Sequence, residues 1–230
     1  MTYITGDTHG RFGRIKEFCN EQKTTKEDVM IILGDVGINY YLDKRDDYLR
    51  EEAAKFPITL FGIHGNHEER PYNIEGYEES GAYGGKVFIN PNYPNQIFAK
   101  DGEIYKFGEK EVIVIGGAYS VGKFMRIKKH KPWFESEQPD DKIKADVERA
   151  LDNHNWKVDV VLTHTCPYDY IPRELFLSYV DQSQVDYATE KWLQEIEDRL
   201  EYTDWYFGHF HGEYKKDRLR CMNKEIEEFE

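Results

Sequence analysis

The chain is poor in cysteine and has no long apolar run, and both absences limit what it can be. Its three cysteines, Cys19, Cys166 and Cys221, lie far apart and form no Cys-x-x-Cys pair. This pattern disfavours a disulfide framework and suits a reducing compartment. The longest wholly apolar run, Val29 to Leu33, is far shorter than the roughly 20 residues that span a bilayer. We therefore expect a cytoplasmic protein with no membrane partner.

Basic residues are also in short supply. The sequence holds 31 Lys and Arg against 44 Asp and Glu, which gives a net charge of -13. Binding along a nucleic-acid duplex needs a broad basic face, so this charge disfavours nucleic acid as a partner. A small anionic substrate stays open, because bound metal ions can supply local positive charge.

What the chain does contain is five short segments in which an apolar run ends in metal-ligand residue types. The runs are rich in β-branched and aromatic residues and are short, which is typical of buried strands. In open α/β sheets the site lies beyond the carboxyl ends of the strands, so the five segments can converge on one crevice. The segments are Gly6-Asp7-Thr8-His9-Gly10, Gly34-Asp35, Gly65-Asn66-His67-Glu68, Thr163-His164-Thr165 and Gly208-His209-Phe210-His211.

The spacing and chemistry of these residues favour two metal ions. Residues two apart in a strand point the same way, so Asp7 with His9, and His209 with His211, can each present two ligands to one side. Carboxylate, imidazole and amide donors suit divalent Mn, Fe, Co, Ni or Zn. The candidate set is too large for one tetrahedral ion, which takes four ligands. It suits two ions about 3.5 to 4 Å apart that share a carboxylate, an arrangement used in phosphoryl transfer.

In this order, the motifs Gly-Asp-x-His, Gly-Asp, Gly-Asn-His-Glu, a strand-end His and Gly-His-x-His resemble those of the calcineurin-like metallophosphoesterases. The resemblance runs from Tyr3 to about His211. It implies an α/β fold, a four-layer α/β/β/α sandwich of mixed sheets with a dinuclear metal site at the C-terminal ends of strands. We expect one domain over residues 1–230, with a basic loop inserted at about 117–137.

The resemblance also implies a role for each motif residue. Asp35 would bridge the two ions, and His67 would be the general acid at the leaving-group oxygen. A hydroxide bridging the two metals would attack phosphorus in line. Mn²⁺ is the favoured ion, with Fe, Ni, Co or Zn as alternatives. The implied ligands of the two ions are, in turn, Asp7, His9 and His211, and Asn66, His164 and His209.

A basic segment stands out in this acidic chain. No acidic residue lies between Gly116 and Phe134. Segments after central strands often form cleft walls, and Arg suits bidentate recognition of phosphate, so Lys123 and Arg126 are candidates for substrate binding. A solvated loop whose charges only keep it soluble is the alternative. Arg70 has a similar pair of interpretations, because it can reach a substrate phosphate or form a surface salt bridge.

The second motif narrows the substrate class. Protein serine/threonine phosphatases, which Gly-Asn-His-Glu also resembles, continue Gly-Asp-x-x-Asp-Arg-Gly. This chain lacks that phosphate-clamping Arg, since it reads Gly34-Asp35-Val36-Gly37-Ile38-Asn39. The resemblance then implies a small bacterial or phage-type phosphatase or phosphodiesterase for a phosphorylated small molecule or nucleotide. A nuclease is the alternative, and a protein phosphatase or a non-catalytic metal-binding scaffold is less favoured.

Periodicity and turn residues predict the remaining elements. Helices are expected at 12–22, 43–56, 138–154 and 185–200. Strands are expected at 2–5, 29–33, 58–63, 158–162 and 205–207. Residues 96–99, 103–107 and 111–115 predict a three-stranded meander, and the stretch from 68 to about 96 predicts loops and short elements around the cleft. The acidic tail at 224–230 gives no clear signal.

Overall fold

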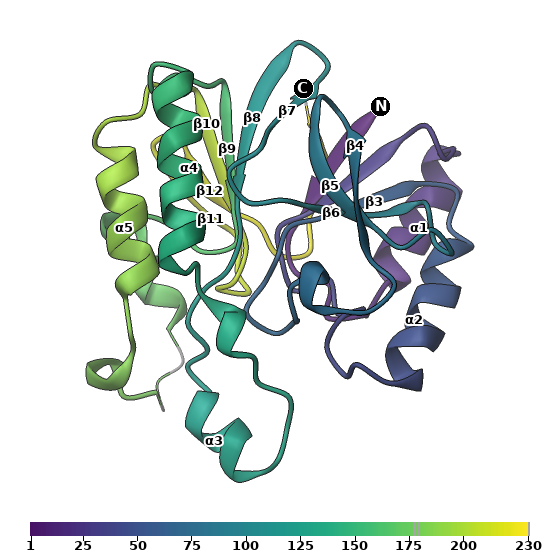
Figure 1. Cartoon of the computed structure of the whole chain (residues 1–230), viewed down its shortest axis with the longest axis horizontal. Helices are drawn as coiled ribbons and strands as arrows, with labels where there is room; N and C mark the ends of the chain where they lie inside the picture. Colours follow the sequence, from purple (N-terminus) through teal and green to yellow (C-terminus); the bar gives the residue numbers. More distant parts are fainter. Residues whose placement is uncertain (177, 179, 230) are drawn as a thin grey trace.

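Two mixed β-sheets, packed face to face, form the centre of the chain in a computed structural model that describes residues 1–176, 178 and 180–229 (Figure 1). The larger sheet contains β1 (Thr2–Thr5), β2 (Val29–Ile32), β3 (Thr59–Gly62), β4 (Glu78–Ala82), β5 (Gly85–Ile89), β6 (Gln96–Ala99) and β13 (Ile226–Glu228). The smaller sheet contains β7 (Ile104–Phe107), β8 (Lys110–Ile115), β9 (Val160–Thr163), β10 (Asp204–Phe207), β11 (Tyr214–Lys216) and β12 (Leu219–Cys221). Their strand orders are β13-β1-β2-β3-β6-β5-β4 and β11-β12-β10-β9-β8-β7.

Helices cover the outer face of each sheet (Figure 1). The larger sheet is covered by α1 (Gly13–Gln22) and α2 (Lys44–Ala54), and the smaller by α4 (Asp141–Asn153) and α5 (Ala188–Glu197). A short helix, α3 (Lys123–Lys128), extends away from both sheets in the segment between β8 and α4. Single 3₁₀ turns lie at Pro71–Asn73, Glu135–Glu137, Tyr168–Tyr170, Arg173–Leu175 and Gln182–Gln184. Among the described residues, no helix is both long and apolar enough to cross a membrane.

Three apolar cores fill the spaces between these layers. Phe61, Val114 and Leu162 belong to the core between the sheets. The other two cores lie between each sheet and its helices, with Ile15 in one and Trp205 in the other. Central strands such as β2 are buried on both faces, which explains why their sequences are continuous apolar runs rather than alternating ones. The predicted α/β/β/α sandwich of mixed sheets is confirmed.

Parallel pairing sets the position of the motifs. β1, β2 and β3 run parallel in register, as do β8, β9 and β10. Their carboxyl ends therefore lie along one edge of each sheet, and the residues that follow these strands face the same crevice.

The predicted meander at 96–115 is wrong in its first strand. β6 pairs with β3 and β5 in the larger sheet, whereas β7 and β8 form a hairpin in the smaller one. The turn at Asp101-Gly102 therefore connects the two sheets. Asp-Gly commonly closes a hairpin between neighbouring strands, so the turn residues alone do not distinguish the two connections. Three further strand regions lacked a clear signal. The β4–β5 hairpin lies within the predicted loop region, the β11–β12 hairpin lies where no element was predicted, and the acidic tail contributes β13 beside β1.

Candidate metal centre

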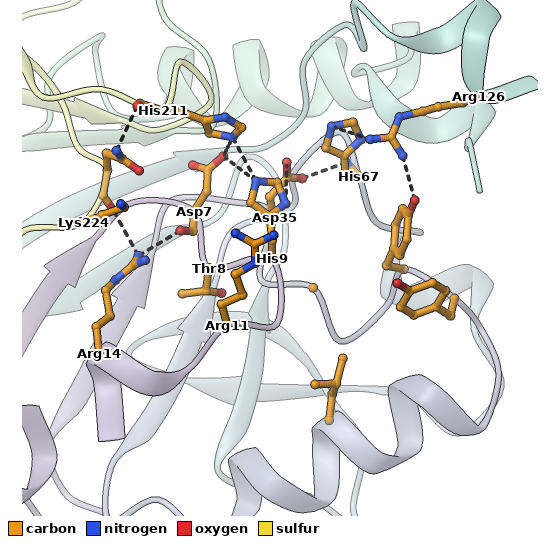
Figure 2. Close-up of a pocket in the computed structure, with 15 residues that line it drawn as sticks. Asp7, Thr8, His9, Arg11, Arg14, Asp35, His67, Arg126, His211 and Lys224 are labelled. Carbon is orange, nitrogen blue, oxygen red and sulfur yellow. Dashed lines mark hydrogen bonds and ion pairs between the residues drawn. The ribbon is translucent and has the colours of Figure 1, made fainter. Parts of the chain in front are cut away.

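The five predicted segments meet at the carboxyl edges of the two sheets. The loops after β1, β2 and β3 carry Asp7, Asp35 and Asn66, and the loops after β9 and β10 carry His164 and the pair His209 and His211. Figure 2 shows Asp7, His9, Asp35 and His211 gathered together, with His67 beside them. The structure thus brings together His9 and His211, which are 202 positions apart in sequence.

Sharp turns at the strand ends aim these side chains inward. Asp35, His9, His209 and His211 all have a left-handed backbone, with φ between 46° and 66°. Non-glycine residues adopt this conformation rarely, and where it occurs it is concentrated at functional sites. The glycines before two of the ligands serve close packing. A side chain at Gly34 would collide with the His164 ring, and one at Gly208 with the Asp7 carboxylate.

One half of the centre, which we call the open half, contains Asp7, His9 and His211. His9 Nε2 and His211 Nε2 lie 2.9 Å apart, and His211 Nε2 lies 3.3 Å from Asp7 Oδ2. Asp7 is held by the backbone N–H of His209, which donates to Asp7 Oδ1 at 2.9 Å. The side chains of His9 and His211 are 33% and 56% exposed, so this half faces solvent.

The buried half contains Asn66, His164 and the half-buried His209. Asn66 Oδ1 lies 2.8 Å from His164 Nε2 and 3.0 Å from His209 Nδ1. The other ring nitrogen of His164, Nδ1, lies 2.8 Å from the Leu33 carbonyl oxygen and donates a hydrogen bond to it. This bond leaves Nε2 free to act as a ligand. Asn66 and His164 are only 2% and 0% exposed.

Asp35 lies between the halves. Its Oδ2 atom is 3.7 Å from His9 Nδ1 and 3.8 Å from His164 Nε2. Its Oδ1 atom accepts a hydrogen bond from the backbone N–H of His67 at 2.8 Å. One carboxylate oxygen therefore faces imidazoles of both halves, which is the placement that a shared ligand requires.

Electrostatics favour charged carboxylates and mostly neutral imidazoles here. Burial alone would raise the pKa of Asp7, but its hydrogen bond with His211 and the nearby imidazoles outweigh burial and lower it. The pKa of Asp35 is also lowered, because the nearby imidazoles of His164 and His67 outweigh the opposing effect of burial. Desolvation lowers the pKa of His209 to about 3, whereas the hydrogen bond with Asp7 raises that of His211. Metal ligands must be deprotonated, so this pattern is suitable for binding cations.

The donor set fits two divalent ions. Ligand atoms of Asp7, His9 and His211 lie within 4.8 Å of one another, and so do those of Asp7, Asp35 and His164. Asp7 Oδ2 is buried, and the His211 imidazole at 3.3 Å gives it only a long, poorly aligned contact. A buried carboxylate oxygen that is incompletely paired costs free energy, which a bound cation would offset.

His67 stands beside the ligands and contacts the basic segment. Arg126 Nη2 lies 3.2 Å from His67 Nε2, and Arg126 Nη1 donates to the Tyr40 hydroxyl at 2.8 Å (Figure 2). Burial lowers the pKa of His67 to about 4, with Arg126 adding to the effect and Asp35 opposing it. In the protein without substrate, His67 is therefore a neutral imidazole at pH 7.

Comparison with known proteins identifies the family. The model of the calcineurin-like phosphoesterases matches residues 2–213. The chain belongs to the calcineurin-like phosphoesterase family. It is therefore a phosphoester hydrolase, and its chemistry is metal-dependent. A search of curated proteins gives no match.

Solved structures share the fold of this phosphoesterase. Phosphopantetheinyl hydrolase from Mycobacterium tuberculosis is 13% identical, with a TM-score of 0.53 over 96% of this chain and 87% of its own. Another crystal structure is 15% identical, with a TM-score of 0.50 over 96% of this chain and 89% of its own. At these identities the likeness establishes the fold alone.

The calcineurin-like centre opens into a cleft of about 650 Å³, which we call the metal cleft. It is lined by Asp7, Thr8, His9, Arg11, Arg14, Asp35, Gly37, Tyr40, Tyr41, Leu49, His67, Arg126, His211, Asn223 and Lys224. Of the three predicted substrate-binding residues, only Arg126 lines it. Arg70 is 2% exposed, pairs with Asp101 and donates to the Ser136 carbonyl. It therefore forms a salt bridge, as the alternative interpretation expected, but the salt bridge is buried and does not lie on the surface. Lys123 lies 4.2 Å from the Trp133 ring centroid instead.

Supporting residues of the phosphoesterase centre were missed from sequence. Asn66 Nδ2 donates to Ser120 Oγ at 2.8 Å, which fixes the orientation of its amide. Arg14 Nη2 donates to the carbonyls of Gly6, Asp7 and Asn223, which ties the first ligand loop to the C-terminal segment. Neither Ser120 nor Arg14 belongs to a motif, and their contacts arise only when distant segments meet.

Proposed function

We propose that this chain cleaves phosphoesters of small molecules or nucleotides by in-line attack of water at two divalent ions, with Mn²⁺ favoured. The observation that carries the proposal is Asp35 Oδ2, which faces His9 in the open half and His164 in the buried half. Bound there, the ions would lower the pKa of water toward about 7 and neutralise charge on the phosphoryl oxygens. We also propose a cytoplasmic location and one domain over residues 1–230.

In this proposal His67 and Arg126 act together at the leaving-group oxygen. The neutral imidazole of His67 donates one N–H, and a phosphoryl dianion arriving beside it would raise its pKa. Arg126 lies 3.2 Å from that imidazole and, in this proposal, would contact a phosphate oxygen through the rest of its guanidinium. Removal of either residue should leave the metal ligands in place.

A substrate panel tests the reaction class. The protein, reconstituted with Mn, Ni, Co, Zn or Mg, would be assayed on phosphomonoesters, phosphodiesters, cyclic nucleotides, phosphopeptides and single-stranded DNA. Metal-dependent turnover of small esters supports the proposal. Turnover of nucleic acid or phosphopeptide alone would instead establish a nuclease or a protein phosphatase, and absence of turnover with every metal would refute a catalytic role.

The role of His67 has its own test. In His67→Ala, kcat should fall by about 10²- to 10⁴-fold while two metals per chain remain, as measured by elemental analysis. The loss should be smaller with nitrophenyl phosphate, whose leaving group needs less protonation. His154→Ala removes an exposed histidine that does not line the metal cleft and serves as the control. Equal losses across leaving groups of very different pKa would assign His67 to positioning instead.

The role of Arg126 is tested with substrates of different charge. Arg126→Ala should raise KM for a nucleoside triphosphate by about tenfold and raise it less for a minimal aryl phosphate, because lost ground-state binding appears in KM. Lys128→Ala, on the same helix but outside the cleft lining, is the matched control. Equal kinetics of the two variants on all substrates would show that the basic segment is a solvated loop with no role in substrate binding.

A further inference from the structure

A second pocket adjoins the metal centre. Unlike the polar metal cleft, it is lined largely by apolar side chains. Its volume is about 360 Å³, and it shares Asp35, Asn66, His67, His209 and His211 with the metal centre. Ligand pockets for small organic groups begin at roughly 300 Å³, so this space accommodates a group of aryl size. A phosphoryl group at the ions would have this pocket directly beside it.

The outer wall of this second pocket, which we call the apolar pocket, is made of apolar side chains. They come from the segment before and within α3, from the segment that leads into α5 and from the loop after β10, and include Tyr119, Val121, Met125, Val185, Tyr187 and Phe210. Val121 and Met125 are 47% and 48% exposed. Apolar surface left open beside a catalytic centre marks a place where an apolar group of a ligand is bound.

One buried acid interrupts this wall. Glu190, in the first turn of α5, lines the pocket and is 4% exposed. Its Oε1 atom accepts a hydrogen bond from Thr165 Oγ1 at 2.8 Å. Its Oε2 atom is buried and has no hydrogen-bond partner among the described residues. Buried polar atoms are almost always paired, so a single unpaired acceptor in an apolar wall indicates a donor that the ligand brings.

We propose that the apolar pocket is the specificity subsite for the ester substituent of the substrate, and that it takes an aryl or branched alkyl group carrying a hydroxyl or amide N–H that donates to Glu190. This inference rests on the proposed phosphoesterase function and names its substrate class. The metal cleft, lined by Arg11, Arg14 and Lys224, would accommodate anionic parts of the same substrate.

Aryl phosphates whose leaving phenols have nearly equal pKa test this subsite. The set is phenyl phosphate, 4-(3-hydroxypropyl)phenyl phosphate and its methyl ether, 4-(3-methoxypropyl)phenyl phosphate. Both larger esters should have a KM about tenfold below that of phenyl phosphate, because they place additional methylenes in the pocket. Assayed at pH 8.5, where Glu190 is ionised, the hydroxyl compound should have a kcat/KM about 3- to 10-fold above the ether, because only it can donate to the Glu190 carboxylate.

Two matched variant pairs separate the subsite from general damage. Met125→Asp should raise KM for the two larger esters by about tenfold, whereas Ile127→Asp, on the same helix, equally exposed and outside the pocket, should not. Glu190→Gln puts an amide N–H in place of an acceptor, so the preference for hydroxyl over ether should disappear. Glu195→Gln, an exposed acid on the same helix, should keep it.

A binding measurement keeps the inference separate from catalysis. Saturation-transfer NMR with the product phenols, 4-(3-hydroxypropyl)phenol and 4-(3-methoxypropyl)phenol, should show tighter binding of the hydroxyl compound to the wild-type protein. Equal KM values for phenyl phosphate and the larger esters, or equal effects of Met125→Asp and Ile127→Asp, would overturn the subsite. Equal binding of the two phenols would overturn the role of Glu190. Absence of turnover on every ester, with phenol binding retained, would instead refute the phosphoesterase function alone.

Discussion

The two halves of the candidate metal centre contain similar potential ligands in very different surroundings. In the buried half, Asn66 and His164 are 2% and 0% exposed and have hydrogen-bond partners behind them, Ser120 and the Leu33 carbonyl. In the open half, the imidazoles of His9 and His211 are 33% and 56% exposed and face the cleft. We therefore propose that the buried half is shaped before a metal arrives, whereas the open half is ordered largely by the metal itself.

The largest expected effect comes from removing the residue that the halves share. Asp35→Ala should lower metal content at both positions and reduce turnover by more than the roughly 10²- to 10³-fold that loss of one transition-state donor costs. Elemental analysis of Mn-reconstituted protein gives the metal content. Retention of one full equivalent of metal would show that one half holds its ion without Asp35, and full activity would exclude the dimetal proposal.

Chelation distinguishes the halves directly. With EDTA, we expect two kinetic phases of metal release, with the phase from the open half at least about tenfold faster, because its ligands are exposed and less supported. His211→Ala should remove the fast phase and His164→Ala the slow one. Release of both ions in one phase from the wild-type protein would contradict the difference between the halves.

A smaller effect should follow when the support behind the buried half is removed. Ser120→Ala deprives the Asn66 amide of its acceptor, and loss of such outer partners typically lowers metal affinity by about 10- to 100-fold. The loss should affect the slow-phase ion and leave the fast-phase ion unchanged. Ser80→Ala, at an exposed position on β4, is the control, and metal titration with a competing chelator is the measurement.

The smallest expected effect concerns the buried carboxyl behind His164, where Thr165 donates a hydrogen bond to Glu190. Burial raises the pKa of Glu190 from its ordinary 4.5 to about 7. Below pH 4.5 both the folded and unfolded states carry this proton, and between 4.5 and 7 only the folded state keeps it. The free energy of unfolding should therefore fall as pH rises through this window, by about 1.4 kcal/mol per pH unit at most, and the slope should vanish above it.

Glu190→Gln should lack the part of the pH dependence of the free energy of unfolding that Glu190 contributes. Urea unfolding of the metal-free wild type and variant between pH 4.5 and 8 measures that part as the difference between their free energies of unfolding. Glu195→Gln, an exposed acid on α5, should keep the wild-type slope. A pH-independent difference between wild type and Glu190→Gln would mean that the carboxyl is well solvated and that burial does not raise its pKa.

Local sequence determined the strand ends, the main helices and which candidate ligand residues follow the strands. Each motif is a buried apolar run followed by glycine and a ligand, so its chemistry is readable within a few residues, and the order of the motifs identified the family. α1 and α4 fell within the expected ranges because their apolar spacing, and for α4 the Asp140 cap, act over neighbouring positions.

Tertiary structure alone decided which side chains support the centre and which leave it. Arg70 was a candidate for phosphate binding, yet Asp101, 31 positions away, holds it in a buried pair. β6 joined the larger sheet and not a meander, because its partner β3 offered a parallel edge. Asn66 meets His164 across 98 positions, and Glu190 reaches the apolar pocket through packing of α5. Such contacts depend on how two sheets dock, and no local window of sequence contains that information.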